Sequence, residues 1–323
     1  MNAVLPRRAV LAATDLTDAS EPVLRAAAEL CARTGATLHV LHAFDMPPSP
    51  YLETAGGIAT FQGGVAACER DVADQVRRVV PAHVQVAQPR VEIYTAHRAI
   101  AEYAEAVGAE LVVIGPHARR ELGTGFLGGT ADRLLRTLDV PCLVVRGGLR
   151  VPVHRVVVPM DLSEWARPAL AAALGWAAEL GAPAADAGDA GDARPSVSVL
   201  HVVPRMLTGA GQPFEAAESQ PGWGRALEET RRMADGAVEV RGAVLPGDRP
   251  GDEIVAFAER ENAELVVMAT HGYGAVKRAL LGSTAQTVAR RAPCPVLLIP
   301  PRMWRDDAHP IVDAAPVFAP PPV

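Results

Sequence analysis

The sequence has few aromatic residues, few cysteines and no excess of basic charge. Aromatic side chains make up 4% of the 323 residues, and the formal net charge is −6. Nucleic-acid-binding surfaces carry a basic patch or stripe, so this charge balance argues against a nucleic-acid partner. The four cysteines form no C-x-x-C pair, which argues against a zinc site or a redox dithiol. We expect buried, reduced thiols in a cytoplasmic protein.

Long apolar runs and the common phosphate-binding motifs are also missing. No run approaches the ~18 residues of a membrane span, so we expect no membrane contact. Residues 7–13 resemble the start of a signal peptide, but Asp15 ends the apolar run, and we interpret the segment as a first strand. The P-loop pattern G-x-x-x-x-G-K-[ST] does not occur, and a single G-x-G-x-x-G at 123–128 lies too far from a first strand for a dinucleotide fingerprint.

The chain contains an internal repeat. His271 minus His117 is 154, and the segments 109–115 and 263–269 keep the same offset. Earlier in each copy, Asp161 minus Asp15 is 146. His201 minus His42 is 159, so the second copy gains 13 residues before its second strand, in an insert near 183–195 that is rich in alanine, aspartate and glycine and is expected to be a surface loop. A tandem duplication accounts for these offsets.

Each copy alternates apolar strands with amphipathic helices. In the first copy we expect strands near 9–13, 37–42, 88–93, 110–114 and 142–145, with helices at about 20–34, 66–80, 97–107 and 130–138. Such βαβ alternation with continuous apolar strands predicts an α/β fold with a doubly wound, five-stranded parallel sheet in each copy. Residues 45–64 and about 204–224 are expected to be long loops. The predicted domains are 1–148 and 149–301, followed by a proline-rich, disordered tail at 302–323.

Small residues after the fourth strand of the second copy suggest a phosphate site. The run Leu265–Ala269 leads to Gly272, and nine residues later Gly282-Ser283-Thr284 opens a helix. A strand, a small-residue loop and a helix N-terminus direct N–H groups and the positive end of the helix dipole to one place. Ser283 could equally be an ordinary helix cap, and Lys277 and Arg278 could be solvated surface charges.

Acidic residues and histidines near the strand ends allow two interpretations each. Asp15 and Asp161 follow the first strand of each copy, where a carboxylate can accept from a ribose hydroxyl or an adenine amino group. Each could instead cap the helix that follows. His117 and His271 have no expected nucleophile beside them, and we interpret them as structural.

These motifs resemble the universal stress protein family, in a tandem form that fills nearly all of the chain. The resemblance is carried by residues 156–164, by Val199-Leu-His-Val202-Val, and by Thr270-His-Gly272 with Gly282-Ser283 before Cys294. The nucleotide-binding branch of that family uses G-x-x-G, nine residues and G-[ST], an Asp after strand one, and the residue after a strand-two His. In the second copy, the resemblance implies a site at Asp161, Val202, Ala269, Gly272, Gly282, Ser283 and Thr284, with Ala269 in place of the first glycine.

The first copy departs further from the family pattern. The resemblance implies a weaker site there at Asp15, Ala43, Gly115, Gly128, Gly129 and Thr130. The second glycine of the pattern is Ala118, and Gly129 replaces the serine. A neutral hydrogen bond contributes ~0.5–1.5 kcal/mol, so the lost hydroxyl could weaken binding about tenfold.

The resemblance implies an ATP-binding regulatory protein of the stress response and not a dedicated enzyme, with magnesium an optional companion of the nucleotide. Two alternatives stay open. One is a slow ATPase or autophosphorylating protein, although the sequence offers no assured base or arginine finger. The other is a nucleotide-free interaction scaffold. The two copies would pack as an internal pseudo-dimer through residues 143–145 and 296–299, and a homodimer of the whole chain is conceivable.

Overall fold

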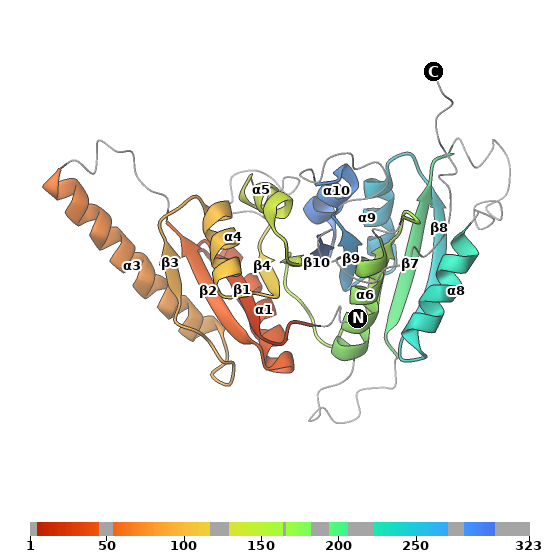
Figure 1. Cartoon of the computed structure of the whole chain (residues 1–323), viewed down its shortest axis with the longest axis horizontal. Coiled ribbons are helices and arrows are strands. Elements are labelled where there is room, and N and C mark those ends of the chain that lie inside the picture. Colours follow the sequence, from red (N-terminus) through yellow and green to blue (C-terminus); the bar gives the residue numbers. More distant parts are fainter. Residues whose placement is uncertain are drawn as a thin grey trace, which may run out of the picture.

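The computed structural model describes residues 5–44, 54–116, 129–163, 166–181, 194–205, 222–270 and 281–300. Within them a single ten-stranded sheet passes through both halves of the chain (Figure 1). The strand order is β3-β2-β1-β4-β5-β10-β9-β6-β7-β8, so each half contributes five neighbouring strands in the same relative order.

The first half supplies strands β1 to β5 and four α-helices within the described residues. The strands are β1 (Ala9–Thr14), β2 (Thr37–Ala43), β3 (Arg90–Glu92), β4 (Leu111–Ile114) and β5 (Cys142–Val144). The helices are a short 3₁₀ turn η1 (Asp18–Ser20), α1 (Glu21–Thr34), α3 (Ala55–Val79), α4 (Ala96–Ala106) and α5 (Gly129–Thr137).

The second half repeats this series over the residues that the structure covers. Its strands are β6 (Arg155–Pro159), β7 (Ser196–Val203), β8 (Glu239–Pro246), β9 (Leu265–Ala269) and β10 (Val296–Ile299). Its helices are α6 (Ala166–Leu180), α8 (Trp223–Ala234), α9 (Pro250–Arg260) and α10 (Ser283–Arg291). The doubly wound α/β fold expected from the sequence is confirmed.

The central strands are buried on both faces, as their continuous apolar sequences require. In β1, Val10, Leu11 and Ala12 are all fully buried; Val10 and Ala12 face one core cluster and Leu11 faces the other. Side chains alternate between the two faces of a strand, so only an unbroken apolar run can satisfy both cores.

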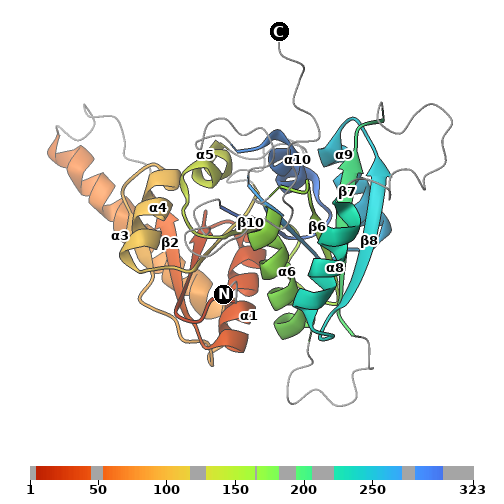
Figure 2. The same ribbon diagram turned by 45° about the vertical axis from the view of Figure 1, so that its right-hand side comes forward.

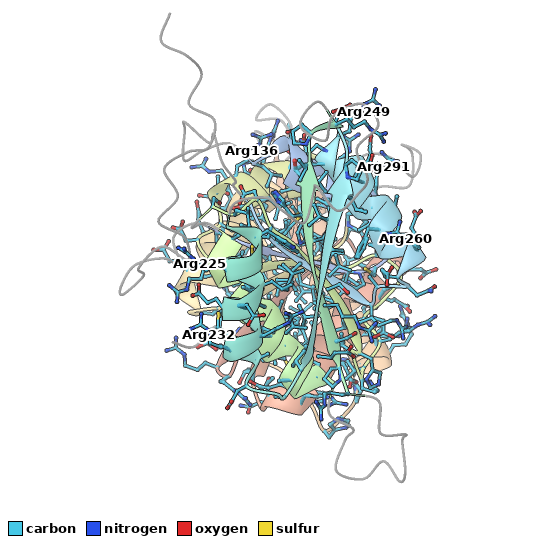
Figure 3. The ribbon with its side chains drawn as sticks, turned by 90° about the vertical axis from the view of Figure 1, so that its right-hand side faces the viewer. Arg136, Arg225, Arg232, Arg249, Arg260 and Arg291 are labelled. Atoms are coloured by element: carbon cyan, nitrogen blue, oxygen red, sulfur yellow. The ribbon has the colours of Figure 1, made fainter. Side chains whose placement is uncertain are left out.

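Helices cover both faces of the sheet. The cluster on one face includes residues of α1, α3, α6 and α8, and the cluster on the other includes residues of α4, α5, α9 and α10. Figure 2 shows these layers from another side. Figure 3 looks at the molecule from the side of its β8 edge, and Arg225 and Arg232 of α8 lie across the sheet from Arg260 and Arg291 of α9 and α10. Each core is therefore shared by both halves.

The two halves join through their last strands. β5 pairs with β10 in antiparallel fashion, with Val144 opposite Val296 and Cys142 opposite Leu298, whereas the other ladders of the sheet are parallel. The expected contact between residues 143–145 and 296–299 is confirmed as a pairing of the last strands, with a ladder that joins 142–144 to 296–298. An antiparallel junction relates the halves by an approximate two-fold axis, so equivalent residues near it approach each other.

One expectation about a loop is wrong. Residues 45–64 were expected to form a long loop, but α3 begins at Ala55 and projects beyond the edge of the sheet (Figure 1). The Thr54 side chain caps this helix by accepting a hydrogen bond from Gly57 N at 3.0 Å. Phe61 packs edge-on against Phe44, with ring centroids 5.7 Å apart. This cap and this contact offset the helix cost of the glycines, about 1 kcal/mol each.

Three further segments for which the sequence predicts loops or disorder lie wholly or mostly outside the described residues. These segments are the tail from Arg302, nearly all of the insert near 183–195 and most of the loop at 204–224. Within the described part of the chain, no helix combines the length and apolarity needed to cross a membrane.

Candidate functional site

The candidate residues of the second half lie where three neighbouring strands end. Asp161 follows β6, Val202 belongs to β7 and Ala269 ends β9, and β6 pairs with both of the other strands. The chain leaves β6 toward β7 on one side and reaches β9 on the other, so β6 and β9 border the switch point of the sheet. Ligands of doubly wound sheets bind at such points.

Equivalent residues of the first half occupy the same places. Asp15 follows β1, Ala43 ends β2 and Gly115 follows β4. Gly129 and Thr130 begin α5, with Gly129 exposed and Thr130 partly buried. Gly128, His117 and Ala118 lie outside the described residues.

The two aspartates organise tight turns at the ends of the first strands. Asp161 Oδ1 accepts hydrogen bonds from Ser163 N at 3.0 Å and Ser163 Oγ at 2.5 Å. Asp15 Oδ1 accepts from Thr17 N and Thr17 Oγ1 at 3.0 and 2.7 Å. These are Asx turns, and the cap of α1 is Ser20, so the alternative role of Asp15 as that cap is not observed.

The backbone inside both turns is strained. Leu16 and Leu162, the residues that follow the two aspartates, have φ angles of 65° and 60°. Such values are uncommon for residues with a branched side chain and persist only where surrounding bonds hold them. The turns therefore fix each carboxylate at the carboxyl edge of the sheet.

A histidine fixes the neighbouring strand in each half. His201 Nδ1 lies 2.8 Å from Met160 O, and His42 Nδ1 lies 2.9 Å from Thr14 O. A carbonyl oxygen only accepts, so Nδ1 carries the proton and donates in both cases. Sequence reasoning used these histidines to align the repeat and to locate Ala43 and Val202 in the family pattern, but it did not predict their bonds to the first strand; their presence before Ala43 and Val202 in both copies was the available signal.

The ring of His201 is enclosed by its surroundings. Its ring stacks on Trp223 with centroids 6.0 Å apart and an interplanar angle of 21°. Burial lowers the pKa of His201, although the bond to Met160 and the nearby Asp161 act in the opposite direction. A neutral ring that donates through Nδ1 leaves Nε2 as an acceptor.

Val202 and Ala43 provide apolar surface at the strand ends. Both are partly buried and pack against the core that lies beneath α4, α5, α9 and α10. Each residue follows its anchoring histidine and faces the opposite side of the strand. A flat apolar group, such as a nucleobase, can lie against a surface of this kind.

The base of the candidate phosphate loop is closed by backbone hydrogen bonds. Gly282 N donates to Thr270 O at 2.9 Å, and Thr270 N donates to Ile299 O at 3.0 Å. Thr270 is 3% exposed, so this anchor is part of the core. The intervening residues 271–280, which include His271, Gly272, Lys277 and Arg278, lie outside the described part of the chain.

The start of α10 is suited to an anion. Gly282 is its N-cap residue and provides no side-chain cap, Ser283 is exposed and Thr284 is partly buried. The first turn contains no acidic residue, and Arg290 and Arg291 are in the last turn. The first N–H groups of a helix have no carbonyl partner within it, and the helix dipole adds positive potential there.

The start of α5 has different chemistry. Pro116 occupies the position of Thr270, since 270 minus 154 is 116, and proline has no N–H to donate. The first turn of α5 also contains Asp132, whose charge opposes an anion at that end. Among the described residues, no group of three histidine, cysteine, aspartate or glutamate side chains could hold a metal ion.

Comparison with protein families gives one match that covers both halves. The model described as "Universal stress protein family" matches residues 6–146 and again 152–300. A universal stress protein of Mycolicibacterium smegmatis is 25% identical over 319 residues, which cover 91% of this chain and 97% of that protein. A universal stress protein of Methanocaldococcus jannaschii is 43% identical over 75 residues; the match covers 23% of this chain and 44% of that relative, less than half its length.

Comparison with solved structures supports the same fold over the whole chain. The crystal structure of a universal stress protein from Archaeoglobus fulgidus DSM 4304 has a TM-score of 0.64 and 22% sequence identity. The match covers 92% of this chain and 98% of that structure. At this identity the likeness concerns the fold and not the ligand.

Proposed function

Because the chain belongs to the universal stress protein family, we propose that it is an ATP-binding regulatory protein whose better site lies in the second half. The observation that carries the proposal is the start of α10. Helical N–H groups that the N-cap side chain does not cap, a first turn without acidic residues and a hydroxyl at Ser283 lie beyond the switch point of the sheet. This combination suits a polyphosphate.

The residues around the switch point fit the remainder of the nucleotide. The phosphates bind at Gly282, Ser283 and Thr284, together with the loop that contains Gly272. The adenine lies against β7 at Val202, and Asp161 accepts from the ribose or from the adenine amino group. Ala269 allows the chain to pass close to the phosphates. Magnesium enters with the phosphate oxygens, because bound Mg²⁺ commonly takes most of its ligands from phosphates and water.

A thermal-shift titration with ATP tests this proposal. A ligand that binds only the folded protein stabilises it by RT ln(1 + [L]/Kd), about 2.7 kcal/mol at 100 times Kd. We expect ATP to raise the melting temperature of the wild type, and Ser283→Ala to weaken binding about tenfold through loss of one hydroxyl. Thr130→Ala, at the start of α5, is the matched control and should leave the stronger affinity unchanged. No shift with ATP, together with equal behaviour of the wild type and Ser283→Ala, would refute the proposal.

Pro116 and Asp132 favour a different role for the first half. One removes an anchoring N–H and the other places a carboxylate in the first turn of α5. We propose that this half acts mainly as an interaction and support module. Calorimetry with ATP on the intact chain distinguishes the roles: one strong binding event supports it, whereas two events of equal affinity contradict it.

A further inference from the structure

Two side chains at equivalent positions of the repeat meet across the junction of the two halves. Asp132 is on α5 and Gln286 is on α10, and 286 minus 132 is 154, the offset of the repeat. Gln286 Nε2 donates to Asp132 Oδ1 at 2.7 Å. Both Figure 1 and Figure 2 show α5 beside α10, above β10.

Asp132 is held firmly within its own helix. Arg136 Nε and Nη2 donate to its two carboxylate oxygens at 3.0 and 3.1 Å. The side chains of Asp132 and Arg136 are 25% and 28% exposed, so water screens this pair less than a fully exposed one. A carboxylate held by a bidentate arginine is a rigid acceptor for Gln286.

The ionised state of Asp132 defines the direction of the contact. Burial alone raises the pKa of this carboxyl, but Arg136 and Gln286 outweigh it, and the net pKa is lowered. An ionised carboxylate only accepts, so the amide nitrogen of Gln286 faces it. The contact is a charge-assisted hydrogen bond, which is stronger than a neutral one.

Gln286 belongs to the first turn of the candidate phosphate-binding helix. Its backbone N donates to Gly282 O at 2.9 Å, the bond that closes this turn. The turn therefore has a backbone anchor at Thr270 and a side-chain anchor at Asp132, and the second comes from the other half.

The other side of α10 rests on its own half. A Cβ added at Gly251 of α9 would lie 2.7 Å from Thr287 Cβ, which shows how closely the two helices approach. Arg291 near the end of α10 forms an ion pair with Asp252 of α9. α9 thus contacts α10 at Thr287 and Arg291, whereas Asp132 contacts it at Gln286 in the first turn.

We propose that Asp132 of the first half is a positioning residue for the nucleotide site of the second half. It holds Gln286, and so holds the first turn of α10 where its N–H groups and Ser283 meet the phosphates. The inference rests on the proposed function, because it names the support of that same site. It gives the first half a defined contribution to binding even if that half binds no nucleotide of its own.

The test compares ATP affinities of intact variants by calorimetry. Asp132→Ala and Gln286→Ala should each weaken ATP binding about fivefold, the effect of about 1 kcal/mol from one hydrogen bond. The double variant should be no weaker than either single variant, because both remove the same contact. Asp132→Asn keeps an amide oxygen as acceptor and should remain within about twofold of the wild type.

The controls separate positioning from charge and from general stability. Asp139→Ala removes a carboxylate just beyond the end of α5 and should leave ATP affinity unchanged. The melting temperature of each variant without ATP reports its structural cost, and rescue of affinity by Asp132→Asn is the readout that a merely structural role would not produce.

Failure of the inference differs from failure of the proposed function. If the wild type binds ATP and Asp132→Ala binds it equally well, or if Asp132→Asn is as weak as Asp132→Ala, the positioning role is wrong while ATP binding stands. If the wild type binds no ATP, both proposals fall together.

Discussion

At the start of their last helices the two halves share a backbone plan and differ in chemistry. In the second half, Thr270 uses its N–H and its carbonyl to anchor the strand end and Gly282. In the first half the same position is Pro116, which can make only one of these two bonds. The first turn of α5 has an aspartate, and that of α10 has no acidic residue. The two halves have therefore diverged at the start of the last helix, whereas the order of their strands is the same.

The opposite edge of the sheet shows what both halves retain. Glu110 Oε2 accepts from the backbone N of Arg7 and Arg8 at 2.7 and 3.0 Å. Glu264 Oε2 accepts from the backbone N of His154 and Arg155 at 2.6 and 2.9 Å. Each glutamate ties the start of the fourth strand of its half to the start of the first. The repeat is preserved where it assembles the sheet.

The largest expected effect concerns the approach of α9 to α10. Gly251→Val should destabilise the protein by about 3 kcal/mol. The new Cβ would collide with the Cβ of Thr287, which is bonded to the backbone and cannot rotate out of the way. His97, at the equivalent position of α4, already has a side chain, so His97→Val should cost less than ~1 kcal/mol. Urea unfolding midpoints measure both; equal midpoints for the two variants would show that the halves pack alike here.

The next effect should be equal in the two halves. Glu110→Ala and Glu264→Ala each remove the acceptor of two backbone N–H groups and of one arginine side-chain N–H, at a cost of about 2 kcal/mol. The pKa of Glu110 is lowered, because bonds from Arg8 and Arg7 outweigh burial. Its contribution is therefore present above the unfolded pKa near ~4.3 and is lost as pH falls through the lower folded pKa. Unfolding curves of the wild type and Glu110→Ala at pH 7 and pH 3 check this pH dependence, and unequal losses of stability from Glu110→Ala and Glu264→Ala at pH 7 would contradict the symmetry.

A smaller gain is expected from Gly129→Ser, which gives α5 the hydroxyl that α10 has at Ser283. The added hydrogen bond should strengthen ATP binding by the first half by about 1 kcal/mol, or roughly fivefold. Pro116 and Asp132 remain, so the second half should stay the tighter site. Calorimetry that shows no change in the weaker binding event would mean that the hydroxyl is not what separates the halves.

The smallest effect concerns acid sensitivity at His201. Burial lowers its folded pKa below the unfolded value of ~6.5, so the unfolded chain binds the proton more readily. The stability that the neutral ring contributes is therefore fully present above the unfolded pKa and is lost as the pH falls through the lower folded pKa. His201→Gln should be less stable than wild type at pH 7.5 but should lose less stability between pH 7.5 and 5.5. Identical pH profiles would show that His201 does not contribute to this loss.

The sheet and the repeat could be predicted because continuous apolar strands and fixed offsets are local signals. The start of α3 could not, because four glycines in 56–64 argue for a loop and only the Thr54 cap and the Phe44–Phe61 contact reverse that preference. The positions of the candidate residues at three adjacent strand ends followed from strand order.

The contact between Asp132 and Gln286 could not be read from local sequence. It depends on which strands meet at the junction, and the antiparallel pairing of β5 with β10 brings these two helices together. The equivalent positions of Asp132 and Gln286 in the repeat were the signal that could have predicted the contact, because residues near an approximate two-fold axis meet their own counterparts.

The pairing of β5 with β10 also sets an order of events on the ribosome. Val144 is made 152 residues before its partner Val296, since 296 minus 144 is 152. At ~5–20 residues per second, translation needs about 8–30 s to cover that stretch. Throughout this interval the nascent first half presents an apolar strand without its final neighbour, and such a strand is open to pairing with other chains. Slow elongation through the second half would therefore lengthen the period in which aggregation competes with folding.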